Sequence, residues 1–223
     1  MSARPILYSF RRCPYAMRAR MTLLYAGIEV RLREVILKDK PAAMLAASSK
    51  GTVPVLVQSD GTVIDESRDI MRWALNQNDP AGWLECADGD NLLVDRCDNE
   101  FKHWLDRYKY AVRFPEHDEG WYRQQGEQFL AQLEIRLSQW HYLTGASLSV
   151  VDVAIAPFVR QFASVDSPWW SERPYPSVSD WLYEFINSPL FLGAMNKYPQ
   201  WLEGDADIPF PTKPHGAETR RQP

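Results

Sequence analysis

The residue best placed to do chemistry is Cys13, which follows Arg11 and Arg12 and stands directly before Pro14. A short apolar run at residues 5–8 ends just before this segment, and a helical pattern begins just after it. Proline suits the first position of a helix because its φ is already helical and its missing N–H is not needed there. This order predicts that Cys13 is the N-cap of a helix that follows a buried strand.

A cysteine at a helix N-terminus has a distinctive chemistry. Its sulfur faces unpaired backbone N–H groups at the positive end of the helix dipole, and both favour the thiolate. Such cysteines have pKa values lowered from about 8.5 to roughly 3.5–7.5. We therefore predict that Cys13 is a nucleophilic thiolate. Most free cysteines are small buried hydrophobic residues, and we assign that structural role to Cys86 and Cys97.

The elements that must position Cys13 lie in residues 1–78, where short β-like runs alternate with helical spacing. The predicted strands cover residues 5–8, 29–37, 53–57 and 62–64, and the predicted helices open at Pro14, Pro41 and Ser67. Asp60-Gly61 is a hairpin turn signal between the last two strands. The order β-α-β-α-β-β-α predicts an α/β domain with a mixed four-stranded sheet.

The rest of the chain has a different sequence pattern. Residues 79–90 are rich in Asp and Gly, which predicts a linker, and residues 91–202 have helical spacing, which predicts an all-α domain. Ser149 and Asp152 form a capping box at the start of one of its helices. The segment from Ser177 to Asp180 predicts the cap of a later helix. We expect residues 203–223 to be an extended or disordered tail.

Composition excludes several classes of protein. The net charge of −4 argues against a nucleic-acid partner, because nucleic-acid-binding proteins are more often basic. The sequence has no apolar run of the roughly 18 residues that cross a membrane and no signal-peptide pattern at its start. Three cysteines do not suggest a disulfide framework, so we expect a reducing, cytoplasmic setting. The four histidines lack metal-ligand spacing, and we expect no metal.

The segment around Cys13 resembles the start of the thioredoxin-like domain of glutathione S-transferases. Residues 13–16 (CPYA) are similar to the monothiol motif of omega-class members and related bacterial proteins, whereas glutaredoxins carry a second cysteine at the position of Ala16. Residues 37–41 (LKDKP) and 51–56 (GTVPVL) resemble further segments of the same class. The resemblance covers roughly residues 5–202, and the combination is more specific than any single motif.

This resemblance implies the glutathione transferase fold, a thioredoxin-like α/β domain followed by an all-α domain, and a homodimer. It implies glutathione as the co-substrate and Cys13 as the catalytic residue. The glutathione-binding residues that it implies are Tyr15, Leu37, Lys40, Val53, Pro54, Glu66 and Ser67.

Each of these positions suits one part of the tripeptide. Lys40 would neutralise the glycine carboxylate, and Ser67 at a helix start would hold the γ-glutamyl carboxylate. Glu66 would pair with the ammonium group. A cis bond between Val53 and Pro54, which the family resemblance implies, would present the Val53 backbone to the cysteinyl residue of glutathione.

The mechanism that we predict is thiol transfer, in which Cys13 forms a mixed disulfide with glutathione. A second glutathione resolves it, because Ala16 offers no resolving thiol. Candidate activities are deglutathionylation, dehydroascorbate reduction and reductive removal of glutathione from conjugates. Two alternatives stay open: conjugation of glutathione to an electrophile, and a non-catalytic module for ligand binding or protein interaction.

We expect the second substrate to be a small hydrophobic molecule or a thiol. Its pocket would lie between Tyr15 and the helical domain. Aromatic residues are available for the facing wall, namely Trp104, Tyr108, Trp169 and Trp170. Core packing is the more common role for such residues.

Overall fold

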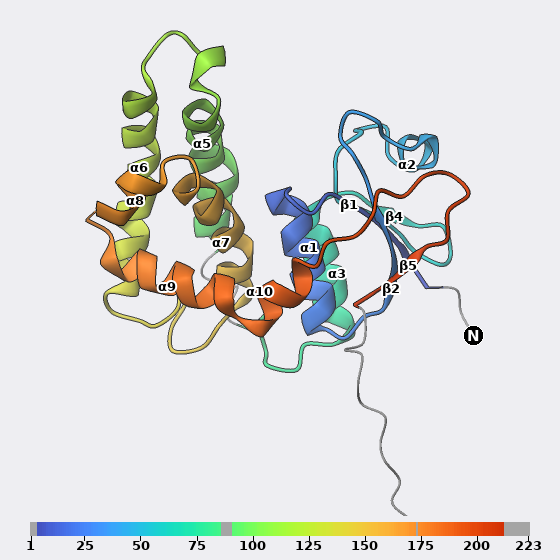
Figure 1. Cartoon of the computed structure of the whole chain (residues 1–223). Coiled ribbons are helices and arrows are strands. Elements are labelled where there is room, and N and C mark those ends of the chain that lie inside the picture. Colours follow the sequence, from blue (N-terminus) through green and yellow to red (C-terminus); the bar gives the residue numbers. More distant parts are fainter. Residues whose placement is uncertain (1–3, 86–90, 173, 212–223) are drawn as a thin grey trace, which may run out of the picture.

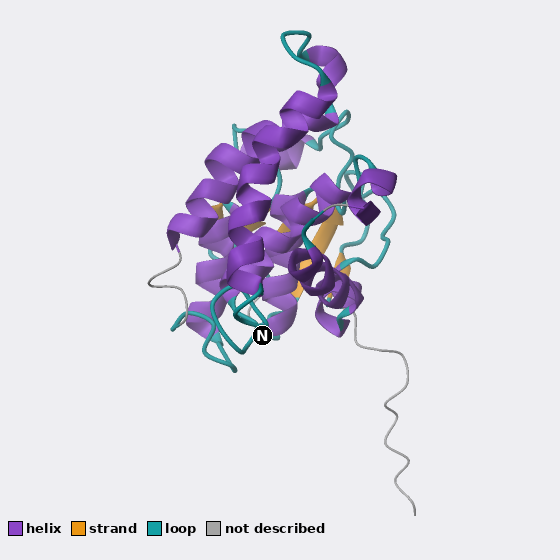
Figure 2. Ribbon diagram, turned by 90° about the vertical axis from the view of Figure 1, so that its left-hand side faces the viewer, coloured by secondary structure: helices purple, strands orange, loops and turns teal. Residues whose placement is uncertain are grey.

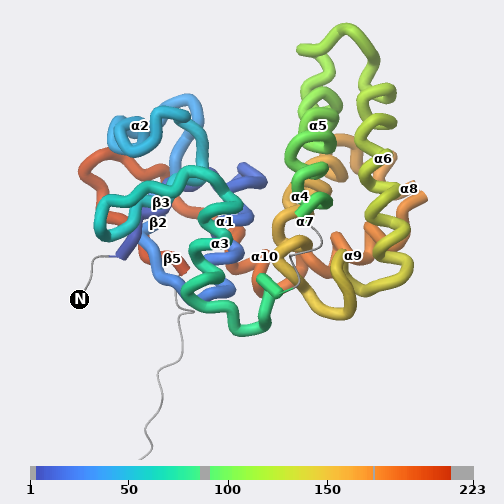
Figure 3. Tube along the Cα trace, turned by 180° about the vertical axis from the view of Figure 1, so that it is seen from behind, coloured from blue at the N-terminus to red at the C-terminus, as the bar shows by residue number. Residues whose placement is uncertain are grey.

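The computed structural model describes residues 4–85, 91–172 and 174–211, so Cys86, part of the predicted linker and the end of the predicted tail lie outside the described residues. Two halves lie side by side (Figure 1). One contains a β-sheet with its covering helices, and the other contains only helices. Seen from behind, the segment after α3 leads from the sheet half to the helical half (Figure 3).

The sheet is mixed and has the strand order β4-β3-β1-β2-β5. Its strands are β1 (Ile6–Ser9), β2 (Val30–Glu34), β3 (Val55–Val57), β4 (Val63–Ile64) and β5 (Ile208–Phe210). β1 and β2 are parallel, and every other pairing is antiparallel. The four predicted strands are all present. The fifth lies in the segment that we expected to be extended or disordered, so the sheet has one strand more than predicted.

Three helices cover the sheet: α1 (Pro14–Tyr25), α2 (Ala42–Ala47) and α3 (Ser67–Gln77). Because side chains alternate along a strand, β1 and β3 each contribute to two cores. Leu7 and Leu32 pack with residues of α1 and α3 on one face. Tyr8 and Val55 pack on the other face with Met44 of α2. The sheet is therefore enclosed between layers, with Cys13 at the start of α1.

The helical half is a bundle, which lies in front of the strands in Figure 2. Its elements are α4 (Asn91–Arg96), the π-helix η1 (Cys97–Phe101), α5 (Lys102–Lys109), the 3₁₀ turn η2 (Ala111–Arg113), α6 (Glu119–Leu137), α7 (Val150–Ala163), α8 (Ser167–Glu172), α9 (Pro176–Asn187) and α10 (Pro189–Ala194). None of the helices in the described ranges is both long and apolar enough to cross a bilayer.

Capping explains two of these helix starts. The predicted capping box of Ser149 and Asp152 is present at the start of α7. The predicted cap at Ser177 is wrong, because Ser177 lies inside the first turn of α9 and Tyr175 occupies the cap position. The Glu134 carboxylate of α6 accepts the N–H groups of Ser177 and Val178 at 3.0 and 2.9 Å. A side chain from a neighbouring helix therefore performs the task that we assigned to a local serine.

Arg18 joins the two halves. This arginine of α1 has no exposed side-chain surface, and its Nε donates to the Ala154 carbonyl of α7 at 2.7 Å. Its guanidinium forms two hydrogen bonds with Asp98 of η1, at 2.6 and 3.1 Å. It also stacks over the Phe158 ring, 4.4 Å from the centroid. The planar guanidinium suits this bidentate contact. The contact connects the helix that begins at Cys13 to the helical half.

The chain returns to the sheet after α10. Trp201 packs in the core on the α2 side, and its N–H donates to the Glu34 carbonyl at the end of β2. β5 then pairs with β2, with Phe210 opposite Val30. Asp207 forms ion pairs with Arg31 and Arg33 of β2. The last part of the described chain therefore completes the first domain.

Candidate active site

Cys13 is the N-cap of α1, as the sequence predicts, and its backbone is extended (φ −76°, ψ 122°). Its Sγ lies 3.6 Å from the Val53 carbonyl oxygen, to which the thiol donates. The backbone N–H groups of Tyr15 and Ala16 face the sulfur and lower its pKa, although neither forms a capping hydrogen bond. The sulfur is thus placed between an acceptor that favours the thiol and donors that favour the thiolate.

The pKa of Cys13 does not follow the prediction. Burial raises the pKa of the thiol above its ordinary value, and this effect outweighs the N–H groups of Ala16 and Tyr15 and the charges of Lys102 and Arg18, all of which lower it. A buried sulfur loses the water that would solvate its negative charge. Burial therefore disfavours the resting thiolate that the sequence predicts, and the N-cap position does not by itself lower the pKa of Cys13 in this structure.

Cys13 opens onto a cavity of about 730 Å³ between the two halves. Of the predicted site residues, Tyr15 and Leu37 line this cavity with it. The Tyr15 ring packs edge-on against Phe158, with 4.9 Å between the centroids, and burial raises the pKa of its phenol, which stays protonated. By contrast, Cys97 is fully buried, and burial raises the pKa of its thiol to about 12, as befits a core residue.

Val53 and Pro54 lie next to Cys13 and are buried. The bond between them is cis, as the family resemblance implies. Lys40 lies outside the lining of the cavity, and its ammonium is next to Gly51 on the segment that leads to Val53. These residues form one border of the site, on the side of α2.

Glu66 and Ser67 differ in position from what we expected. Glu66 is the N-cap of α3 and Ser67 is its first residue, so the predicted capping role of Ser67 is wrong. Glu66 forms an ion pair with Lys50 at 2.6 Å, and Ser67 is buried, with its hydroxyl 3.5 Å from the Arg18 guanidinium. Sequence reasoning missed both Lys50 and Arg18. Tertiary packing brings Lys50 to Glu66 and Arg18 to Ser67, and no spacing rule predicts these contacts.

The wall that the helical half contributes is polar. Lys102, Asp106 and Lys109 of α5 line the cavity, together with Arg160 and Gln161 of α7. The three α5 residues are four and three positions apart, which places them on one helix face. This spacing is visible in the sequence and could have predicted a polar helix face at the cavity.

The aromatic wall that we considered is not formed. Tyr108 is 1% exposed and belongs to the core. Trp104 packs edge-on against Trp121, and Trp169 packs against Phe162. Core packing is thus the role of these rings, and none of them, nor Trp170, is among the described residues that line the cavity.

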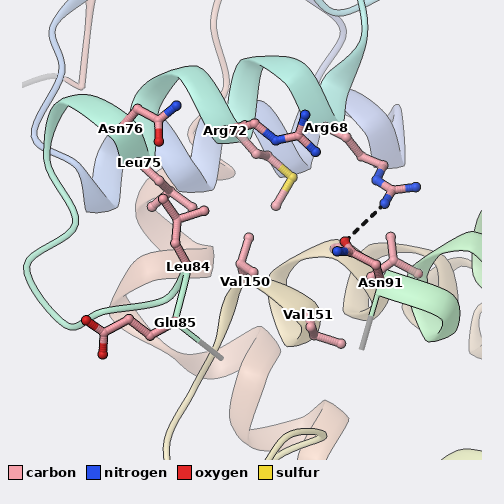
Figure 4. A pocket seen from close by; sticks show the side chains of 12 residues that line it. Arg68, Arg72, Leu75, Asn76, Leu84, Glu85, Asn91, Val150 and Val151 are labelled. Carbon is pink, nitrogen blue, oxygen red and sulfur yellow. Dashed lines mark hydrogen bonds between the residues drawn. The ribbon is translucent and has the colours of Figure 1, made fainter. Parts of the chain in front are cut away.

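A second cavity, of about 430 Å³, lies between α3 and the start of α7. Figure 4 shows Arg68, Arg72 and Asn76 of α3 opposite Val150 and Val151 of α7, with Arg68 bonded to Asn91 at 3.3 Å. Cys13 does not line this cavity. In the described parts of the chain, no three His, Cys, Asp or Glu side chains are grouped as metal ligands would be.

Comparisons with known proteins agree with this arrangement. The model of the glutathione S-transferase N-terminal domain matches residues 7–82, and that of the C-terminal domain matches residues 100–182. The chain belongs to the glutathione S-transferase superfamily. The two matched segments correspond to the sheet half and the helical half, and the fold that the resemblance implied is confirmed.

Among individual members of the superfamily, the chain is 24% identical to glutathione S-transferase omega-1 of Sus scrofa over 216 residues, which cover 95% of this chain and 88% of the relative. A glutathione transferase of Phanerochaete chrysosporium, solved with oxidized glutathione, superposes with a TM-score of 0.75 at 16% identity over 86% of this chain and 94% of that one. A family member of Pseudomonas fluorescens, solved with two glutathione molecules, gives 0.72 at 15% identity over 87% and 93%. These structures show the shared fold.

Proposed function

We propose that this protein is a glutathione-dependent thiol transferase with Cys13 as its nucleophile. The observation that carries the proposal is the position of the Cys13 sulfur. It lies at the N-terminus of α1, at the border of a cavity between the two halves, and 3.6 Å from the Val53 carbonyl of the cis-proline segment. The solved relatives with oxidized glutathione and with two glutathione molecules support glutathione as the ligand.

The glutathione contacts belong to the same proposal. The Val53 backbone would bond the cysteinyl residue, and Lys40 would neutralise the glycine carboxylate. Glu66 and the buried Ser67 would receive the γ-glutamyl end beside the start of α3, where backbone N–H groups favour an anion. The homodimer that the resemblance implies stays a prediction, which analytical ultracentrifugation tests.

The proposed reaction proceeds in two exchanges. The Cys13 thiolate attacks the glutathione sulfur of a mixed disulfide between glutathione and a second thiol. A Cys13–glutathione disulfide forms, and the second thiol leaves as its thiolate, which takes a proton from water. The thiolate of another glutathione then attacks the bound glutathione sulfur. Oxidised glutathione leaves and the Cys13 thiolate is regenerated.

Cys13 must first lose its proton to water, and the Val53 contact couples this loss to the binding of glutathione. The thiol now donates to the Val53 carbonyl oxygen. A cysteinyl N–H of bound glutathione would donate to the same oxygen, so that the Cys13 thiol loses its acceptor. The sulfur would then face the N–H groups of Tyr15 and Ala16, which favour the charged form. Ligand docking and activation of the nucleophile would thus be coupled.

The test is intact-mass measurement after incubation with oxidised glutathione. The wild-type protein is expected to gain one glutathione, which reduced glutathione removes, and Cys13→Ser is expected to gain none at this position. Peptide mapping assigns the adduct, so that Cys86 and Cys97 serve as internal controls. Absence of an adduct on Cys13 across the alkaline range would overturn the proposal.

Conjugation of glutathione to an electrophile is the second candidate, and the raised pKa of Cys13 favours it. A protonated thiol can donate to the glutathione thiolate, as a hydroxyl would. The same variant separates the two candidates. Thiol transfer is lost in Cys13→Ser, whereas conjugation survives because serine also donates. A non-catalytic module would show neither activity in the wild-type protein.

A further inference from the structure

The cavity beside Cys13 has a charge that the whole molecule does not share. The chain carries a net charge of −4. Among the described residues that line the cavity, however, Arg12, Lys102, Lys109 and Arg160 are cationic and only Asp106 is anionic. A cavity with one sign of charge and low-dielectric walls concentrates ligands of the opposite sign.

Three of these cations have no acidic partner. Asp106 forms an ion pair with Lys102. In the part of the chain that the structure describes, Arg12 contacts the Phe10 ring, Lys109 the Tyr110 ring and Arg160 the Phe191 ring, and none of the three contacts a carboxylate. Unpaired cations on an exposed surface are ordinary, but here they converge on one cavity from the turn before α1, from α5 and from α7.

Arg160 is the most informative of them. It lies in the last turn of α7 and is partly buried. Burial lowers the pKa of its guanidinium, and the nearby charge of Arg11 lowers it further. A charge that is withdrawn from water without a counter-ion is costly. An anionic ligand group at this position would remove that cost.

The carboxylates of glutathione do not account for these cations. The proposed function places the two carboxylates at Lys40 and near Ser67, on the side of α2 and α3. Lys109 and Arg160 lie across the cavity on the helical half, where the group attached to the glutathione sulfur would extend. The cations therefore face the second substrate.

We propose that the second substrate carries an anionic group, such as a carboxylate, on the part that is joined to the glutathione sulfur, and that Lys109 and Arg160 bind this group. The inference rests on the proposed function, since glutathione must occupy the border formed by Val53. The inference favours acidic thiols as second substrates over the hydrophobic molecules that the sequence analysis also allowed.

The experiment uses thioethers of glutathione, which bind without reacting. S-(2-carboxyethyl)glutathione, S-(2-aminoethyl)glutathione and S-propylglutathione have substituents of similar size and of negative, positive and zero charge. Titration calorimetry on the wild-type protein is expected to give a Kd about tenfold lower for the carboxyethyl form than for the propyl form, since charge-assisted contacts of this kind exceed neutral ones. The difference should shrink as salt is added.

Variants then assign the effect to the named cations. Lys109→Gln combined with Arg160→Gln is expected to remove the preference while the Kd for S-propylglutathione stays the same. Arg160→Glu is expected to shift the preference toward the aminoethyl form. Arg72→Gln, which removes a cation from the other cavity, is the matched control and should keep the wild-type preference.

The outcomes separate the two proposals. Equal Kd values for the three thioethers in the wild-type protein would overturn this inference and leave the glutathione site standing. Failure of all three to bind would overturn both. A carboxyethyl preference that survives in the Lys109 and Arg160 double variant would assign the anion to other residues and refute the site proposed here.

Discussion

At the scale of single residues, the place of Cys13 and its protonation have different causes. The strand-Cys-Pro-helix order predicts the N-cap position, because these are local features of the backbone. The raised pKa comes from burial of the sulfur, and the thiol's acceptor is the Val53 carbonyl, 40 residues away. Short-range reasoning found the N–H groups that stabilise a thiolate but could not foresee the surroundings that outweigh them.

This leads to a prediction for the ligand-free protein. Because burial raises the pKa of Cys13 above that of an ordinary cysteine, its thiolate fraction at pH 7 is lower than that of a free cysteine. Alkylation of Cys13 by iodoacetamide should be slow at pH 7 and should keep rising at pH values at which a free cysteine is already ionised. Rates are measured by mass spectrometry of the Cys13 peptide, with free glutathione as the reference. A half-point below about 8.5, the ordinary value of a free cysteine, would contradict it.

The site as a whole could be predicted only in part for the same reason. Motif resemblance led to the cis Val53–Pro54 bond, which the structure contains. Arg18 and Lys50 make their contacts through tertiary packing, and no local pattern announces them. Lys102 and Lys109 could have been found from their helical spacing with Asp106, had polar residues been examined with the same periodicity as apolar ones.

At the scale of elements, the start of α7 depends on one buried carboxylate. Asp152 has no exposed surface and accepts four hydrogen bonds. Its donors are the Leu143 N–H at 2.9 Å, the Ser149 N–H at 3.0 Å, the Ser149 hydroxyl at 2.8 Å and the Trp181 indole N–H at 2.9 Å. The capping box predicted the Ser149 contacts. Leu143 and Trp181, from the preceding loop and from α9, add a role that the box alone does not imply.

Asp152→Ala should therefore be far more damaging than the loss of an ordinary cap. Each buried donor that is left without an acceptor costs about 1–3 kcal/mol, so we expect the free energy of unfolding to fall by about 3 kcal/mol or more. Asp118→Ala, at the exposed N-cap of α6, is the matched control and should cost about 1 kcal/mol. Urea denaturation followed by circular dichroism measures both. Equal losses would show that Asp152 is only a cap.

The strands differ in how clearly the sequence predicts them. The sequence predicts the strands β1 to β4. β5 contains Pro209 and is followed by Pro211, and proline argues against a strand because it lacks the N–H that a sheet uses. The strand forms because β2 offers it an open edge and because Phe210 fills a space between Arg20 and Tyr198.

At the scale of the whole molecule, the two ends of the chain share one domain. Phe210 has no exposed surface and belongs to the same core as Leu7 and Leu32. Phe210→Ala should lower the free energy of unfolding by about 3–5 kcal/mol, since a large buried ring is lost and a cavity remains. Leu202→Ala, at a side chain that is 54% exposed, is the control and should change it by less than about 0.5 kcal/mol. Urea midpoints measure the difference.

A small effect of Phe210→Ala would show that β5 is an accessory strand. A large effect would show that the sheet needs it. The ion pairs of Asp207 with Arg31 and Arg33 support the second outcome, because they fix β5 against β2 at both arginines.

The pairing of β5 with β2 also bears on how the protein is made. Arg33 and Asp207 are 174 positions apart, so β2 leaves the ribosome long before its partner strand is synthesised. Domains generally fold in order from the N-terminus during synthesis. Throughout that interval the outer edge of β2 is bare, and a bare strand edge can pair with other chains. Nascent chains that stop before β5 therefore retain an unpaired strand edge that can bind other chains. The edge is covered once β5 has been synthesised.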